Sequence, residues 1–112
     1  MKQFALALDL KNDPYLIAEY EAHHRAVWPE IVESLKASGI LECSIYRIEN
    51  RLTMVLITKD EFDFNQKAIA DKANPKVQEW ESFMWKYQEA LPTAKPGEKW
   101  ALMKEIFKLS AE

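Results

Sequence analysis

The stretch EYEAHHRAVWPEI, residues 19–31, contains both histidines of the chain, and histidine is the side chain that ordinarily titrates near neutral pH. If the stretch is helical, the adjacent His23 and His24 point about 100° apart. The spacing of four residues then puts His24 on one face with Tyr20 and Trp28. Tyr20 and His24 would project side by side as two groups that can exchange protons, while His23 would face solvent. The alternative for His24 is an ordinary hydrogen-bonded core histidine.

Other reactive side chains are fewer and have a structural interpretation. The acids Asp60, Glu61 and Asp63 stand where a helix is expected to begin, and acids there complement the helix dipole. Cys43 has no histidine near it in the sequence, and we interpret it as a small core residue. The chain has two glycines and therefore no glycine-rich phosphate loop, and it has no serine-nucleophile or zinc-ligand spacing. We expect neither a cofactor nor a metal.

Two elements and a proline position the histidine stretch. Residues 3–10, QFALALDL, alternate apolar and small or polar side chains, which is typical of a strand. Asn12 or Asp13 can then cap a helix that has Pro14 at its first position. Pro29 cannot donate a bond inside a helix and should end this one. A second helical piece is expected over residues 29–38, with a glycine as its natural end.

The middle of the chain predicts a hairpin. Residues 40–50, ILECSIYRIEN, and residues 52–58, LTMVLIT, are two apolar runs of strand-forming residues. A turn is expected at 49–51, which makes the two strands antiparallel. A short helix should follow, beginning between residues 60 and 63.

The last third predicts a longer helix, a loop and a final strand. Asn74 and Pro75 are cap and first residue of the helix, and Trp80 lies on an apolar stripe that extends to Leu91. Such a stripe is more often core than ligand platform, and Glu81 is the acid beside it. A Pro/Gly loop over residues 92–100 leads to a last strand at 102–109.

The order of elements is therefore β-α-β-β-α-β, which is the ferredoxin-like arrangement of an antiparallel sheet with helices on one face. The chain is an α+β protein, and its 112 residues form one domain, 1–112. Leu, Ile and Phe occur on both faces of the strands. A second subunit is expected to cover the face that the helices leave open.

The net charge of the chain and the composition of its apolar segments indicate which partners and which compartment to expect. A net charge of −3 gives no electrostatic case for binding nucleic acid or an anionic membrane. The N-terminal apolar stretch is short and interrupted by Asp9, unlike a signal peptide. No run approaches the roughly 18 apolar residues of a membrane span. With one cysteine no internal disulfide can form, and we expect a cytoplasmic protein.

Three segments together resemble a known family. YEAHHRAVWPEI, residues 20–31, resembles the Y-x-x-x-H-x-x-x-W-P-E signature of the L-rhamnose mutarotases. NPKVQEWESFM, residues 74–84, resembles their later helix, and KEIFKL, residues 104–109, resembles their terminal strand. The resemblance implies a homodimer with a dimeric α+β barrel fold. It also implies interconversion of the anomers of a free 6-deoxy monosaccharide without metal or cofactor.

The resemblance also assigns roles to individual residues. The proton-donating histidine of the family falls on His24 and its substrate-contacting helix tyrosine on Tyr20. The first of two adjacent substrate-contacting tryptophans is Trp80, but Glu81 stands at the second position. A further tyrosine of the family, on the second strand, aligns with Cys43. These departures bear on which sugar fits, and L-fucose competes with L-rhamnose.

The chemistry agrees with what these side chains can do. Mutarotation opens the sugar ring by removing a proton from the anomeric hydroxyl and delivering one to the ring oxygen. A histidine can do both near neutral pH, and Trp80 and Trp28 could stack on the apolar face of the sugar. Trp28 could instead brace the break at Pro29. Two other functions stay open: a sugar-binding module without catalysis, and a dimeric α+β barrel monooxygenase.

Overall fold

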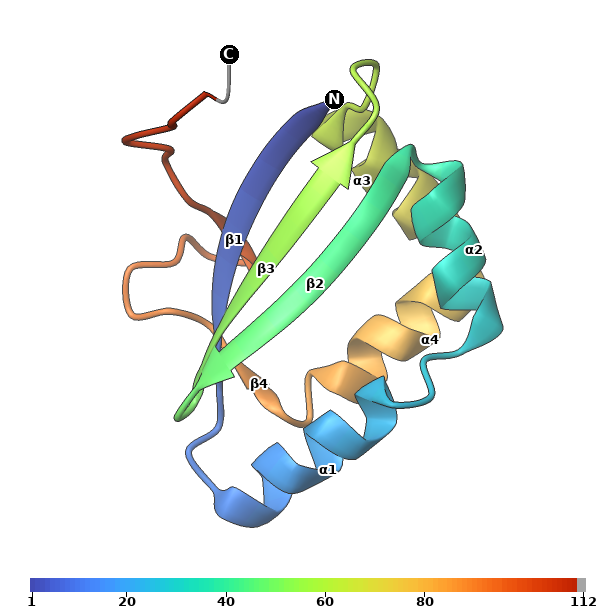
Figure 1. Cartoon of the computed structure of the whole chain (residues 1–112). Coiled ribbons are helices and arrows are strands. Elements are labelled where there is room, and N and C mark those ends of the chain that lie inside the picture. Colours follow the sequence, from blue (N-terminus) through green and yellow to red (C-terminus); the bar gives the residue numbers. More distant parts are fainter. Residues whose placement is uncertain (111–112) are drawn as a thin grey trace.

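A computed structural model describes residues 1–110 of the chain. Its elements, in chain order, are β1 (Lys2–Leu10), α1 (Pro14–His24), α2 (Pro29–Ala37), β2 (Ile40–Ile48), β3 (Arg51–Thr58), α3 (Phe64–Ala73), α4 (Pro75–Met84), β4 (Gln88–Glu89) and β5 (Ala101–Leu102). The sheet is antiparallel, in the order β2-β3-β1-β4, and β5 also pairs with β1 (Figure 1).

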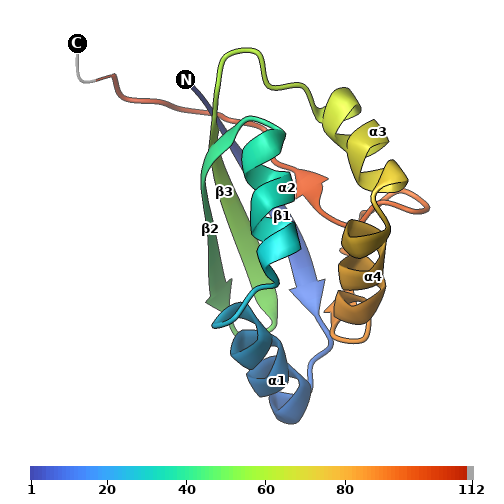
Figure 2. The ribbon, with the colours of Figure 1, turned by 90° about the vertical axis from the view of Figure 1, so that its right-hand side faces the viewer.

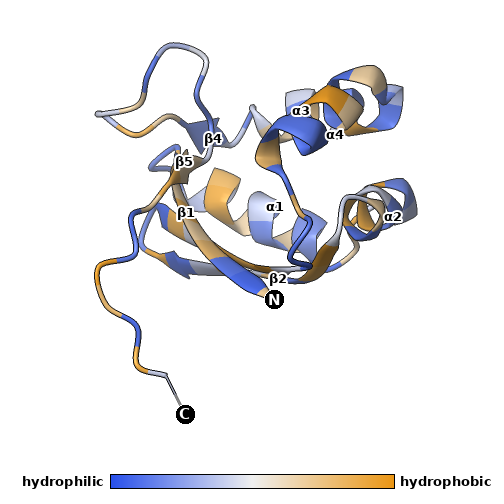
Figure 3. Cartoon of the chain, turned by 90° about the horizontal axis from the view of Figure 1, so that it is seen from above, coloured by the Kyte–Doolittle hydropathy of each residue, from blue (hydrophilic) through white to orange (hydrophobic). Residues whose placement is uncertain are grey.

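The four helices cover one face of this sheet. Figure 2 shows α2, α3 and α4 beside the strands, with α1 at the end where β2 finishes. Figure 3 shows all four helices on the same side of the curved sheet, while the C-terminal segment leaves on the other side. The predicted α+β class and the ferredoxin-like arrangement are therefore confirmed.

The helix starts follow from local capping. The carboxylate of Asp13 accepts bonds from the amides of Tyr15 and Leu16, and Pro14 is the first residue of α1. Asp63 caps α3 in the same way, and Asn74 caps α4 ahead of Pro75. A side-chain oxygen satisfies backbone N–H groups that the first turn leaves without a partner. These starts, and the start of α2 at Pro29, agree with the sequence predictions. The predicted end of the first helix at Pro29 was wrong, because α1 already ends at His24 and Trp28 lies outside it, as the residue that precedes α2.

Strand alternation positions the core between the sheet and the helices. Leu8 and Leu10 of β1, with Leu52 and Leu56 of β3, turn to the helical face and are almost fully buried. Fully burying one such side chain contributes about 1.5–3 kcal/mol. Tyr20 of α1 belongs to the same core and is held there by packing from α4.

The predicted extent of the long helix was wrong. Helix α4 ends at Met84, and the amide of Tyr87 bonds the carbonyl of Met84 in a tight turn (2.9 Å). The carbonyl of Tyr87 then accepts the amide of Lys11 (2.8 Å), and Gln88 begins a pairing with the end of β1. Long-range pairing therefore takes over from helical periodicity after Met84.

The predicted last strand, residues 102–109, was also wrong in most of its length. Only Ala101 and Leu102 pair with β1. In that register Ile106 would stand opposite Lys2, the first residue of β1, so Leu109 would have no partner on that strand. Residues 104–110 leave the sheet (Figure 1). Their apolar side chains are exposed.

Within the described part of the chain, no helix combines the length and the apolar character that a membrane span requires.

Candidate active site

A cavity of about 580 Å³ lies between the sheet and the helices. Residues from all four helices, from β2, β3 and β4, and from the loop before β5 line it. Most of the lining is apolar, with a few polar side chains, which is the usual composition of a small-molecule site. Six of the polar side chains are Tyr20, His24, Cys43, Glu81, Gln88 and Lys99.

The predicted pairing of Tyr20 with His24 is present in this cavity. Their ring centroids lie 4.3 Å apart, and Nδ1 of His24 lies 2.9 Å from the backbone carbonyl oxygen of Tyr20. A carbonyl only accepts, so Nδ1 carries the hydrogen, and Nε2 keeps a lone pair in the neutral ring. Burial lowers the pKa of His24, although the Tyr20 carbonyl opposes the effect. The ring therefore favours its neutral form, with Nε2 ready to accept a proton.

The hydroxyl of Tyr20 is held as a donor. Nε2 of the buried Gln88 donates to this hydroxyl across 3.4 Å. Burial raises the pKa of Tyr20, so the phenol keeps its hydrogen at neutral pH and can offer it to a bound molecule. Sequence reasoning missed Gln88 because it treated residue 88 as part of a helix.

Trp80 forms an apolar part of the cavity wall. Its ring centroid lies 5.7 Å from that of His24, and the two rings are edge to face. Trp28 packs against Trp80 at 5.0 Å and lies stacked on Phe83 at 6.1 Å. Trp28, at the start of α2, thus supports Trp80 of α4. The stacking of either ring on a sugar stays a prediction.

The loop before β5 reaches into the site, and sequence reasoning named none of its residues. Nζ of Lys99 donates to the backbone carbonyl of Glu81 (3.2 Å) and lies over the Trp85 ring. Burial lowers the pKa of Lys99, and the charge of Glu81 opposes this effect. Trp100 packs against both apolar clusters of the core. Glu81 lines the cavity beside Trp80, as its adjacent position suggested.

Cys43 is not the packed core residue that we predicted. It lies on β2 opposite Leu56, turns to the helical face and is accessible to solvent through the cavity. The surrounding protein raises the pKa of its thiol, and the charge of Lys67 offsets part of this rise. A small side chain at this position leaves the floor of the cavity open.

The prediction that His23 faces solvent was wrong. Nε2 of His23 lies 3.2 Å from the Tyr87 hydroxyl, and that hydroxyl donates to Oε1 of Glu19 at 3.1 Å. Since the hydroxyl hydrogen goes to Glu19, Nε2 of His23 is the donor in its own bond. The ring also packs edge to face on Phe83 at 4.6 Å. The face of α1 next to His24 therefore meets the end of α4 rather than water.

Among residues 1–110, the His, Cys, Asp and Glu side chains form no group of three that could hold a metal ion. The chemistry available to this cavity is that of a neutral imidazole, a phenol and hydrogen-bonding groups next to an aromatic wall. Such a set suits proton transfer on a small polar molecule.

Comparisons of sequence and of structure both find proteins named as sugar mutarotases. Residues 3–109 match the sequence profile of a family described as L-rhamnose mutarotase. A protein named L-fucose mutarotase from Xanthomonas campestris is 45% identical, over 98% of this chain and 90% of that one. An L-rhamnose mutarotase of Phocaeicola vulgatus is 31% identical, over 86% and 88%. The crystal structure of an L-rhamnose mutarotase from Formosa agariphila, 20% identical, shares the fold with a TM-score of 0.73, over 98% of this chain and all of the other.

Proposed function

The chain belongs to the L-rhamnose mutarotase family, and we propose that it interconverts the α and β anomers of a free 6-deoxy hexose, either L-fucose or L-rhamnose. The observation that carries the proposal is the Tyr20–His24 pair in the wall of the cavity. The name of the 45% identical relative favours L-fucose over L-rhamnose. The catalytic role falls to His24, and no cofactor takes part.

The proposed reaction moves one proton between two oxygens of the sugar. Nε2 of His24 takes the proton of the anomeric hydroxyl, the bond between the anomeric carbon and the ring oxygen breaks, and the imidazolium gives the proton to the ring oxygen. Rotation about the adjacent carbon–carbon bond then presents the other face of the carbonyl. The reverse steps close the ring and restore neutral His24. The Tyr20 hydroxyl donates a hydrogen bond to the oxygen that carries negative charge.

The modest chemistry of this site is sufficient for such a reaction. General acid/base catalysis by one positioned side chain typically contributes about 10²- to 10⁴-fold. Mutarotation already proceeds in water, so it needs no strong electrophile. Trp80, and the side chains of Glu81 and Cys43, are proposed to bind the sugar, while Trp28 contributes through its packing on Trp80.

We also propose that the protein is a cytoplasmic homodimer. Strand alternation turns Tyr46 and Ile48 of β2 to the face of the sheet that carries no helices, and both are largely exposed. Ile106 and Phe107 of the departing C-terminal segment are exposed as well. A second copy that covers this apolar surface would remove it from water. The free thiol of Cys43 suits a reducing compartment.

The proposal is tested by saturation-transfer NMR of anomer exchange in L-fucose and L-rhamnose, together with ultracentrifugation for the dimer. Wild type should accelerate exchange of at least one sugar, and folded His24→Ala should not. Equal exchange rates for the two proteins would refute the catalytic role of His24. Sugar binding without faster exchange would instead identify a binding module.

A further inference from the structure

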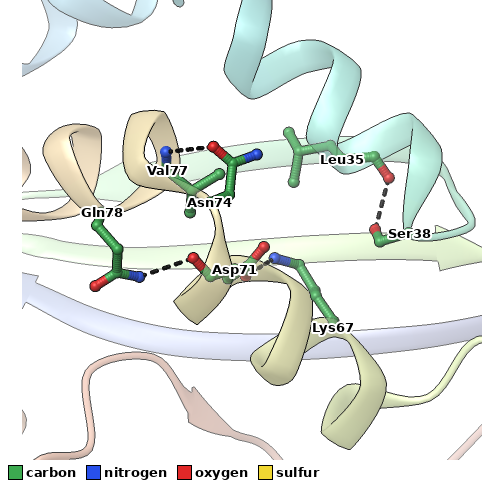
Figure 4. A network of polar contacts seen from close by, with 7 residues as sticks. All are labelled: Leu35, Ser38, Lys67, Asp71, Asn74, Val77 and Gln78. Carbon is green, nitrogen blue, oxygen red and sulfur yellow. Dashed lines mark hydrogen bonds and ion pairs between the residues drawn. The ribbon is translucent and has the colours of Figure 1, made fainter.

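Helix α3 turns a charged pair toward the cavity. Lys67 and Asp71 stand one turn apart, their side chains form an ion pair of 2.5 Å, and both line the cavity. Figure 4 shows the side chains of Lys67 and Asp71 reaching toward each other along α3, with the strands behind the helix. The two side chains are 21% and 14% exposed. The helical face that points inward therefore carries charges where a helix that only packs would carry apolar side chains.

Fold stability does not account for this pair. Even on a helix surface an ion pair at this spacing contributes only about 0.3–0.5 kcal/mol, and this pair is largely withdrawn from water, which adds a desolvation cost. Two apolar side chains at these positions would suit a cavity whose lining is mostly apolar. Apolar side chains at these two positions could stabilise the fold without the desolvation cost of two charges.

The pair keeps hydrogen-bonding capacity while its charges remain matched. The Lys67 ammonium group has three hydrogens, and the Asp71 carboxylate has a second oxygen beside the one that faces Lys67. The helix end is fixed from the other side, because Gln78 donates its side-chain amide to the backbone carbonyl of Asp71 (3.0 Å). A donor and an acceptor are therefore held next to each other on a rigid support.

The pair shares one cavity with Tyr20 and His24. Cys43 lines the same cavity as both pairs, and the charge of Lys67 acts on its thiol. A molecule whose reacting end contacts Tyr20 and His24 can therefore extend past Cys43 toward the charged pair. Neighbouring hydroxyls of a sugar ring match this pair, one donating to a carboxylate and the next accepting from an ammonium group.

We infer that Lys67 and Asp71 form a second subsite, which binds adjacent hydroxyl groups of the sugar away from its anomeric carbon and so selects among 6-deoxy hexoses. The inference rests on the proposed function. L-Fucose and L-rhamnose differ in configuration at C2 and C4, so a fixed donor and acceptor cannot meet the hydroxyls of both sugars equally well. The subsite is thus a determinant of specificity and takes no part in the proton transfer.

The test compares Lys67→Met and Asp71→Asn with Lys72→Met, which removes an exposed lysine from the same helix. Sugar affinity is measured by calorimetry and exchange kinetics by saturation-transfer NMR, for both sugars and for their 2-deoxy and 4-deoxy analogues. We expect each subsite variant to weaken binding and lower kcat/KM by about 10- to 100-fold for the preferred sugar, with kcat at saturation little changed and Lys72→Met unaffected. The analogue that lacks the contacted hydroxyl should bind Asp71→Asn no worse than wild type.

Several outcomes would overturn the inference. Unchanged affinity and kinetics in both variants would do so, as would losses that are equal for both sugars and all their analogues, since these indicate a structural role. Lys67→Gln, checked by its melting temperature, replaces Lys67→Met if that variant does not fold. Wild type that binds sugar but accelerates no exchange refutes the mutarotase, while weaker binding by the variants still supports the subsite. If wild type binds none of these sugars, both the proposed function and the proposed subsite are refuted.

Discussion

Helix α1 presents two adjacent histidines to different surroundings. His24 bonds the carbonyl of Tyr20 through Nδ1, lines the cavity and keeps a lone pair on Nε2. His23 donates its Nε2–H to Tyr87, whose hydroxyl is in turn engaged by Glu19. The residue type is the same, but the engaged nitrogen and its partner differ. We propose proton transfer for His24, which lines the cavity, while His23 fastens α1 to the turn after α4.

The most direct test of this difference is to make the same substitution at His24 and at His23. His24→Gln should lower the anomer exchange rate by about 100-fold or more, because it removes the general acid/base. His23→Gln should leave that rate within about threefold, since a glutamine amide can still donate to Tyr87. Both rates come from saturation-transfer NMR on proteins of matched melting temperature. Equal losses at the two positions would contradict the assignment.

Acidification provides the next test of His24. Burial lowers the pKa of His24 below its ordinary value of about 6.5. The catalysed rate should therefore be level at neutral pH and fall about tenfold per pH unit below the lowered pKa, where Nε2 is already protonated.

The same shift has a consequence for stability. His24 binds a proton more tightly in the unfolded chain than in the folded protein. The contribution of neutral His24 to the free energy of unfolding is therefore fully present above about pH 6.5. That contribution is lost as the pH falls through the lowered pKa of the folded state. The melting temperature of wild type should then fall more on acidification than that of His24→Gln. Parallel curves for the two proteins would argue against the lowered pKa.

Tyr20→Phe probes the cavity side without touching the imidazole. The variant removes the donor to the charged oxygen of the substrate and should lower the exchange rate by up to about tenfold. His24 keeps its bond to the backbone carbonyl of residue 20, so the tautomer is unchanged. Tyr15→Phe, at an exposed position of α1, serves as the matched control. A loss as large as that of His24→Gln would assign proton transfer to the tyrosine.

The sequence predicts the arrangement of Tyr20 and His24 on α1 better than it predicts the surroundings of His23. Tyr20 and His24 stand four residues apart in one helix, and the cap at Asp13 marks the beginning of that helix, so local signals suffice. The surroundings of His23 depend on where α4 ends. That end is set by pairing of Gln88 with Leu10, residues distant in the chain, and no local pattern announces it. Lys99 enters the site for the same kind of reason, from a loop whose path depends on β5.

The smallest expected effect tests the fastening role of the His23 side. Tyr87→Phe keeps the buried ring but removes the hydroxyl that joins His23 to Glu19. Because Glu19 is exposed, water replaces part of the lost bonding, and the free energy of unfolding should fall by about 1 kcal/mol. Urea denaturation measures this change, and the exchange rate should stay within about threefold of wild type. A tenfold loss of rate at unchanged stability would contradict a purely structural role. Unchanged stability would show that α1 is still held in place, so a displaced His24 could not explain the loss. The hydrogen bonds of His23 would then influence the reaction itself.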